Sequence, residues 1–248
     1  MIQEIIQISK KAGKEIMRIY NTDFGVEFKE DNSPLTEADT AAHNIIKKEL
    51  EKYNLPILSE EGKQLSYETR KDWNKFWLVD PIDGTKDFVK RTGDFTVNIA
   101  LIENQTPVLG VVYVPAKDVT YYADETGAYK QEQNSKPQKI QAREIPEKEI
   151  IVVASRNHLN EETKHFIEEK RKTHDVHLTS VGSSIKLCLV AEGKADIYPR
   201  LGPTSEWDTA AANAVVLKAG AHVYQYNTAK ELQYNKEDLL NPFFIVKK

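Results

Sequence analysis

The sequence predicts a layered α/β fold with mixed sheets, formed by a single catalytic domain that spans residues 1–248. Apolar residues recur at helical spacing in some segments, and short apolar runs of strand length separate these segments. The two kinds of segment do not alternate strictly, which favours packed layers over a barrel. Hydrophobic residues make up 40% of the chain and charged residues 29%, a balance typical of globular proteins.

The first half, about residues 1–145, begins with two predicted helices. Apolar residues at helical spacing place them near residues 2–17 and 39–52. Apolar runs predict strands at residues 76–79, 95–101, 108–114, 121–123 and 127–129. The strand at 76–79 is expected to end abruptly at Asp80, and a turn at Asn104-Gln105 is expected to join the next two strands. Residues 131–149 are polar and predict a surface connection, although a structured polar edge is an alternative.

The second half, about residues 146–248, is predicted to be α/β, whereas the first half is predicted to be α+β. A buried-type strand is expected at 150–154, followed by a charged, exposed helix at 161–172. Further helices are predicted at 183–192 and 209–219, and further strands at 195–199 and 221–224. Gly193 and Gly220 stand where the last two helices should end, a common position for glycine.

Composition excludes several classes of protein. The formal net charge of −4 disfavours a nucleic-acid polymer as partner, because phosphate backbones select basic surfaces. Cys188 is the only cysteine, so neither an internal disulfide nor a cysteine-rich zinc site can form, and a reducing cytoplasm is expected. No signal peptide or transmembrane segment is visible in the sequence. Oligomeric state and peripheral contact with the cytoplasmic face of a membrane stay open.

The informative segment is Asp80-Pro81-Ile82-Asp83-Gly84-Thr85, which follows the predicted buried strand at 76–79. Two carboxylates held this close repel each other unless a cation lies between them. Magnesium commonly uses one or two carboxylates and shares its other positions with water and phosphate. If a helix starts after Gly84, its free amides would favour a phosphate. The alternative is that Asp80 and Asp83 are ordinary turn residues.

Two further acidic strings strengthen the metal hypothesis. Glu60 follows the apolar pair Ile57-Leu58, and Asp208 stands just before an alanine-rich segment. Taken alone, Glu60 reads as solvated surface and Asp208 as a helix N-cap. The coincidence of all three strings favours a shared acidic metal site.

These strings resemble the two signatures of the inositol monophosphatase superfamily, a group of magnesium-dependent, lithium-sensitive phosphatases. The signature-like residues are 78–85 and 206–211. Within the superfamily, the flanking strings are most similar to those of the bacterial 3′(2′),5′-bisphosphate nucleotidases. These strings are residues 31–36, 86–91, 95–101, 181–193 and 198–204. The resemblance extends over nearly the whole chain and implies a layered αβαβα sandwich of the inositol monophosphatase and fructose-1,6-bisphosphatase type, with mixed sheets.

The resemblance also implies a ligand set for two or three Mg²⁺ ions. Glu60, Asp80 and the backbone carbonyl of Ile82 would hold one ion, and Asp80, Asp83 and Asp208 a second. By the same resemblance, Glu60 and Thr85 would position and activate the attacking water, with Asp39 supporting Thr85. A metal-assisted displacement at phosphorus needs no side-chain nucleophile, so Cys188 is interpreted as a core residue.

A bisphosphate substrate also needs a second anion site. The cationic candidates are Lys186, Arg200 and His158, with Ser155 and Ser184 as neutral donors. The other predicted substrate-binding residues are Asp83, Gly84, Thr85, Gly182 and Asp208. Asn157 replaces the serine that the resemblance leads us to expect beside His158. The alternatives are a surface histidine at 158 and a solvated helix face at Lys186.

The function expected from the resemblance is hydrolysis of adenosine 3′,5′-bisphosphate, a by-product of sulfate activation, to AMP and phosphate. An inositol monophosphatase is the closest alternative, because it would use the same metal site. A non-catalytic nucleotide- or metal-sensing protein is the alternative from another class, but a sensor need not keep Glu60 and Thr85.

Overall fold

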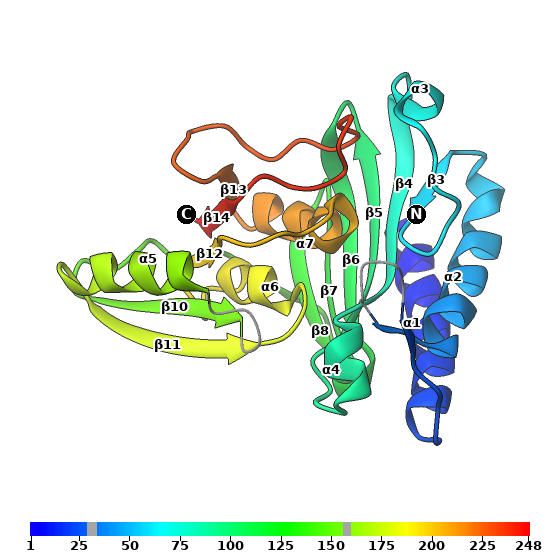
Figure 1. Cartoon of the computed structure of the whole chain (residues 1–248), viewed down its shortest axis with the longest axis horizontal. Helices are drawn as coiled ribbons and strands as arrows, with labels where there is room; N and C mark the ends of the chain where they lie inside the picture. Colours follow the sequence, from blue (N-terminus) through cyan, green and yellow to red (C-terminus); the bar gives the residue numbers. More distant parts are fainter. Residues whose placement is uncertain (29–33, 156–159) are drawn as a thin grey trace.

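The computed structural model describes residues 1–28, 34–155 and 160–248, which form five stacked layers (Figure 1). Helices α1 (Ile2–Tyr20) and α2 (Glu37–Leu50) cover one face of a seven-stranded sheet. Helices α6 (Ile185–Ala191) and α7 (Glu206–Lys218) lie between this sheet and a second group of strands, and α5 (Glu161–Arg171) packs outside that group. The expected αβαβα sandwich is therefore confirmed.

The seven-stranded sheet has the simple order β3-β4-β5-β6-β7-β8-β9. Its strands are β3 (Ile57–Ser59), β4 (Lys75–Asp83), β5 (Thr96–Glu103), β6 (Thr106–Val114), β7 (Val119–Asp124), β8 (Gly127–Glu132) and β9 (Gln138–Lys139). Among the described strands of this sheet, only β3 and β4 pair in parallel. The turn between β5 and β6 falls at the predicted Asn104 and Gln105, whose positive φ angles of 49° and 63° suit a tight hairpin.

Strand β4 is buried on both faces and so connects two cores. Trp77 and Val79 point toward α1 and α2, whereas Phe76 and Leu78 point toward α7. Because side chains alternate along a strand, Asp80 continues the row that faces α7. The carboxylate of Asp80 therefore lies on the α7 side of the sheet, next to the core that β4 and α7 form together.

The second group of strands has two parts. Strands β10 (Glu149–Ser155) and β11 (Asp175–Val181) are parallel. Strand β14 (Phe244–Lys247) lies between β12 (Tyr198–Arg200) and β13 (His222–Gln225). A parallel bridge between Val152 and Ile197 connects the two parts.

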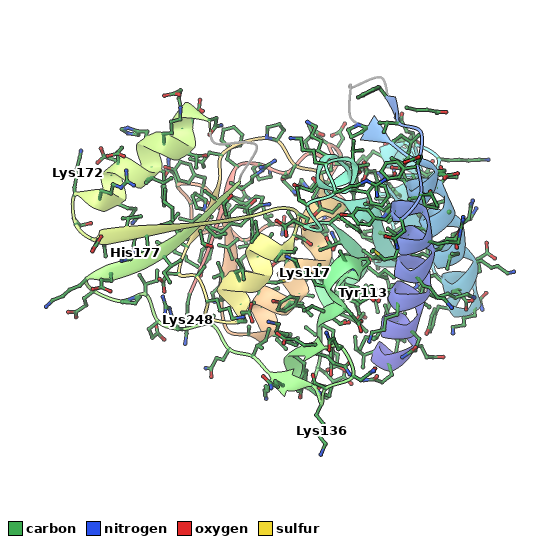
Figure 2. All side chains as sticks on the ribbon, turned by 90° about the horizontal axis from the view of Figure 1, so that it is seen from below. Tyr113, Lys117, Lys136, Lys172, His177 and Lys248 are labelled. Atoms are coloured by element: carbon green, nitrogen blue, oxygen red, sulfur yellow. The ribbon has the colours of Figure 1, made fainter. Side chains whose placement is uncertain are left out.

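The surface carries most of the charge. Lys136 and Lys172 project from the periphery, whereas Tyr113 is buried between the central sheet and α1 (Figure 2). Within the described ranges, no helix combines the length and the apolar character that crossing a membrane requires.

Several expected boundaries are wrong for local reasons. Strand β4 does not end at Asp80 but continues to Asp83 through a register irregularity, where three steps on β4 oppose two on β5. Helix α6 starts at Ile185 instead of 183 because Ser183 has a positive φ of 50°. The stretch 131–149 is not only a connection, since it contains the edge strand β9.

Some short or polar elements were not predicted. These include β1 (Glu27–Phe28), β2 (Pro34–Leu35), α3 (Tyr67–Arg70), β3, β9, β11 and β14. A helix, α4 (Thr85–Val89), does start directly after Gly84, as the sequence analysis allowed. Strand β11 lies at the edge of its sheet and is mostly exposed. It therefore lacks the apolar run that would have identified it. Helix α5 is charged as expected, but Phe166 and Ile167 are buried on its inner face.

Candidate metal centre and adjoining cleft

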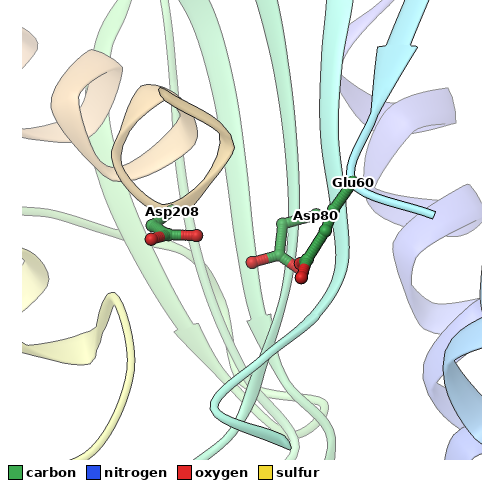
Figure 3. A group of neighbouring side chains, drawn as sticks. All are labelled: Glu60, Asp80 and Asp208. Carbon is green, nitrogen blue, oxygen red and sulfur yellow. The ribbon is translucent and has the colours of Figure 1, made fainter. Parts of the chain in front are cut away.

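Three carboxylates from three elements meet at one end of the central sheet. Glu60 follows β3, Asp80 lies on β4 and Asp208 lies in the first turn of α7. One carboxylate oxygen from each residue lies within 4.8 Å of the others (Figure 3). The structure thus brings together residues that are separated by up to 148 positions in the chain.

Local backbone geometry explains this meeting. Because β3 and β4 are parallel and Ser59 pairs with Val79, the next residues, Glu60 and Asp80, lie side by side. The Glu60 N–H donates to Val79 O at 3.1 Å and fixes the chain there. Asp208 is held because its Oδ2 accepts the N–H of Ser205 at 2.9 Å in the capping box of α7.

The cluster is electrostatically strained without a cation. Burial, followed by the charges of Glu60, Asp83 and Asp208, holds the pKa of Asp80 well above its usual range. Burial and the charges of Asp83 and Glu60 do the same for Asp208. Asp80 Oδ1 accepts the Ile82 N–H at 3.0 Å, but no donor from the described residues pairs with its buried Oδ2. These oxygen donors fit a hard divalent cation.

Asp83 is near, but not one of, the three carboxylates whose oxygens lie within 4.8 Å of one another. Its Oδ2 accepts the N–H of Ser184 at 2.5 Å. Burial raises the pKa of Asp83 to about 6, although Lys186 and the Ser184 N–H oppose that rise. Asp83 therefore connects the carboxylate cluster to the cleft beside it.

Thr85 is the first residue of α4, two positions after Asp83. Its Oγ1 lies 3.3 Å from Asp39 Oδ1 and 3.1 Å from Ile82 O. Asp39 is itself fixed, since its Oδ2 accepts both the N–H and the hydroxyl of Thr36 at 2.8 and 2.7 Å. The α2 N-terminus thereby holds the hydroxyl of Thr85 in place.

A cleft of about 300 Å³ adjoins Asp83 and Asp208. Most of the residues predicted to bind substrate line it, namely Asp83, Gly84, Thr85, Gly182, Ser184, Lys186, Arg200 and Asp208. Lys86 also lines it and was not singled out from the sequence. The predicted His158 lies outside the described residues, as does the side chain of Ser155.

Lys186 is not on a solvated helix face. It is 6% exposed, and its Nζ donates to Ser183 O at 2.7 Å and lies 5.7 Å from the ring centre of Tyr198. Burial lowers its pKa to about 8, partly offset by the charge of Asp83. Arg200 points Nη2 at Pro203 O (2.8 Å), and its buried Nε has no partner among the described residues. With Lys86, these two residues bring three cationic side chains to the cleft next to the acidic cluster.

Two polar residues of β5, Thr96 and Asn98, contact Ser184 in the wall of the cleft. The sequence analysis did not identify either of them. Ser184 Oγ donates to Asn98 Oδ1 at 2.9 Å and lies 2.9 Å from Thr96 Oγ1. Asn98 pairs directly with Asp80 across the sheet. The available signal was a buried polar residue within the apolar run 95–101. With its N–H on Asp83 and its hydroxyl on Asn98, Ser184 has both of its donors engaged inside the protein.

Known proteins with similar sequences carry consistent names. The 3′(2′),5′-bisphosphate nucleotidases CysQ of Salmonella typhimurium and Escherichia coli K12 are each 46% identical to this chain, over 99% of both sequences. The crystal structure of CysQ from Bacteroides thetaiotaomicron has a TM-score of 0.89 and 47% identity, and covers 99% of this chain and 96% of that one.

More distant solved structures share the same fold. The IMPase of Thermotoga maritima is 27% identical with a TM-score of 0.78, covering 98% of this chain and 89% of that one. The model of the inositol monophosphatase family matches residues 1–244. With the acidic cluster, the adjoining cleft and the layered fold in agreement, the chain belongs to the inositol monophosphatase family.

Proposed function

We propose that the protein is a Mg²⁺-dependent phosphatase that hydrolyses the 3′-phosphate of adenosine 3′,5′-bisphosphate to AMP and phosphate. The observation that carries this proposal is the position of Lys186 and Arg200 in the cleft next to the carboxylate cluster. A substrate with two phosphates needs one cationic site in addition to the metal centre. The names of the CysQ relatives, which are 46% identical over nearly the whole chain, support the same substrate.

The carboxylates would hold two or three magnesium ions. Glu60, Asp80 and the carbonyl of Ile82 would bind one ion, and Asp80, Asp83 and Asp208 a second. Bound magnesium would neutralise charge on the phosphate and favour the deprotonated form of the attacking water. The buried Oδ2 of Asp80, which has no hydrogen-bond partner among the described residues, supports this role.

The protein's own groups would orient the reactants. Thr85 Oγ1, whose own proton is directed at Asp39, would accept a hydrogen bond from the attacking water, and Glu60 would take the other proton of that water. Gly84 and Gly182 line the cleft, and a Cβ there would lie 3.1 and 2.5 Å, respectively, from Asp94 O, so glycine at both positions lets the wall of the cleft pack against Asp94.

The second phosphate would be bound on the other side of the cleft. Lys186 and Arg200 would hold the 5′-phosphate, and Ser155 and His158 would complete the nucleoside pocket. Ser184, whose two donors are engaged inside the protein, would act indirectly by holding Asp83 through its N–H. Guanidinium and ammonium groups both suit phosphate, the first by its planar fork and the second as a point charge.

Parallel assays of phosphate release test the proposal. Adenosine 3′,5′-bisphosphate and inositol 1-phosphate are compared with Mg²⁺ present, each beside a chelator control. We expect strong preference for the nucleotide and loss of activity on chelation. Preference for inositol 1-phosphate would be consistent with the proposed metal centre but would refute the proposal that the cleft binds a nucleotide. Magnesium binding without release from either substrate would instead favour a non-catalytic sensor.

A further inference from the structure

The segments that carry Glu60 and Asp208 do not pack tightly against each other. A cavity of about 690 Å³ lies beside Glu60 and is also lined by Trp207, Arg70 and Leu239. Apolar packing across this gap therefore cannot by itself fix the separation between the two carboxylates. Another set of contacts must hold the two segments in place.

Glu206 provides the first of these contacts. It stands at the first position of α7, two residues before Asp208, and its side chain is fully buried. Its Oε2 accepts the Asn235 N–H at 2.6 Å, and its Oε1 accepts the Lys236 N–H at 3.0 Å. The Lys236 ammonium completes the set at 2.5 Å from Oε1. The start of α7 is thus tied to residues 235–236 through a buried, charge-assisted network.

Arg70 holds the same segment from the opposite side. It is 2% exposed and ends α3, ten residues after Glu60. Its Nη1 donates to Asn235 Oδ1 at 3.0 Å and to Lys236 O, and its Nη2 donates to Glu237 O at 2.8 Å. Asn235 Nδ2 returns a bond to Arg70 O at 2.7 Å. Residues 235–237 are therefore held between the Glu60 segment and α7.

We propose that Glu206 is a positioning residue for the metal centre, which acts with Arg70 through residues 235–237 to fix the Asp208 carboxylate relative to Glu60. The inference rests on the proposed function, in which both carboxylates hold magnesium. A buried carboxylate of this kind has no need to touch substrate. Its effect is on the spacing of the ligand oxygens, and groups that orient metal ligands in this way typically change metal affinity by about 10–100-fold when replaced.

The test is magnesium affinity of the folded protein, measured by titration calorimetry without substrate. Glu206→Gln keeps an acceptor for one backbone N–H but loses the charge that binds Lys236. We expect about tenfold weaker Mg²⁺ binding, together with lower stability toward urea. The magnesium concentration for half-maximal turnover should rise by a similar factor.

Asp196→Asn is the matched control. Asp196 is also a buried carboxylate, bound by Arg143 Nε at 2.7 Å and by the Ile151 N–H at 2.6 Å, but it lies outside the acidic cluster and the cleft. The Asp196→Asn variant should be less stable toward urea than the wild-type protein but should bind Mg²⁺ with the same affinity. If Glu206→Gln behaves in the same way, its role is structural only and the proposal is overturned.

A second variant decides the case if Glu206→Gln does not fold. Lys236→Met removes only the ammonium partner, whose side chain is 27% exposed, and should weaken Mg²⁺ binding in the same direction by a smaller factor. Unchanged binding in this variant would refute the proposal. Absence of Mg²⁺ binding in the wild-type protein would instead refute the proposed function, and this inference would fall with it.

Discussion

At the residue scale, Asp83 has two separable properties. Its carboxylate oxygen accepts the Ser184 N–H, which is a structural contact that an amide oxygen can also make. Its negative charge faces Lys186 across the cleft and lies near the carboxylate cluster, where an amide is a much weaker ligand for magnesium. Removing the charge alone should therefore separate catalysis from folding.

The Asp83→Asn variant should nearly abolish turnover, by more than about 100-fold, while it retains cooperative unfolding. Turnover of adenosine 3′,5′-bisphosphate and thermal unfolding followed by circular dichroism check the two parts. Loss of the cooperative transition would show that Asp83 has a structural role instead.

In the proposed function, Lys186 binds the second phosphate. Removing a charged hydrogen-bond donor typically costs about 1.5–3 kcal/mol, so Lys186→Met should raise KM for adenosine 3′,5′-bisphosphate by about 10–100-fold. Adenosine 3′-monophosphate lacks the 5′-phosphate, and its KM should change little. Lys130→Met is the control, because Lys130 is also mostly buried but pairs with Glu192 at 3.0 Å and does not line the cleft. Equal losses on both substrates would contradict the assignment.

The pKa of Lys186 adds a pH dependence with a defined sign. Burial lowers this pKa from 10.5 to about 8, so the free protein loses the ammonium charge as pH rises through about 8. The ratio kcat/KM reports groups of the free enzyme, so for the bisphosphate it should fall above pH 8. In the Lys186→Met variant, the fall of kcat/KM above pH 8 should disappear. If the fall persists in this variant, another group causes it.

At the element scale, α7 is buried on nearly all sides because it forms the middle layer of the sandwich. Its buried residues run almost without a break from Thr209 to Val216, which is the pattern of a core helix and not of a surface helix. Helix α1, in contrast, buries one face only, and its periodicity was readable in the sequence. The close approach of α7 to the sheet depends on Gly110 in β6.

A side chain at Gly110 would collide with α7. A Cβ there would lie 2.2 Å from Ala211 O and 2.8 Å from Ala214 Cβ, so the helix would have to move. We expect Gly110→Ala to lower the free energy of unfolding by about 1–3 kcal/mol. Gly25→Ala is the control, since nothing lies within 4 Å of the added Cβ. Urea unfolding measures both, and similar stabilities would show that α7 can shift at little cost.

At the scale of the whole molecule, the two sequence halves share one core. Phe76 and Leu78 from the first half and Leu187 and Val215 from the second belong to the same buried cluster. Neither half can bury these side chains without the other. We therefore propose that residues 1–248 form one cooperative domain and not two independent ones.

Calorimetric unfolding should accordingly show one transition, with equal calorimetric and van't Hoff enthalpies. A fragment of residues 1–145 should lack a cooperative transition, because its exposed sheet face would be uncovered. Two resolved transitions in the full chain, or a cooperatively folded fragment, would contradict the single-domain proposal.

By itself the sequence determined the layered fold class, most of the helices, the hairpin strands and the three acidic strings. Each of these depends on residues close together in the chain: apolar periodicity, turn residues and short motifs. Glu60, Asp80 and Asp208 were predicted together because each ends or begins a recognisable element. Strand β11 was missed because its polar edge sequence carries no such periodicity.

Tertiary structure alone decided how the site is supported. The contact between Arg70 and Asn235 joins residues 165 positions apart, and that between Ser184 and Asn98 spans 86. The burial of Lys186, and hence its lowered pKa, depends on neighbours such as Tyr198, Asp83 and Arg200. No local pattern encodes these pairings, because the geometry of a hydrogen bond or a buried charge exists only after distant segments have packed together.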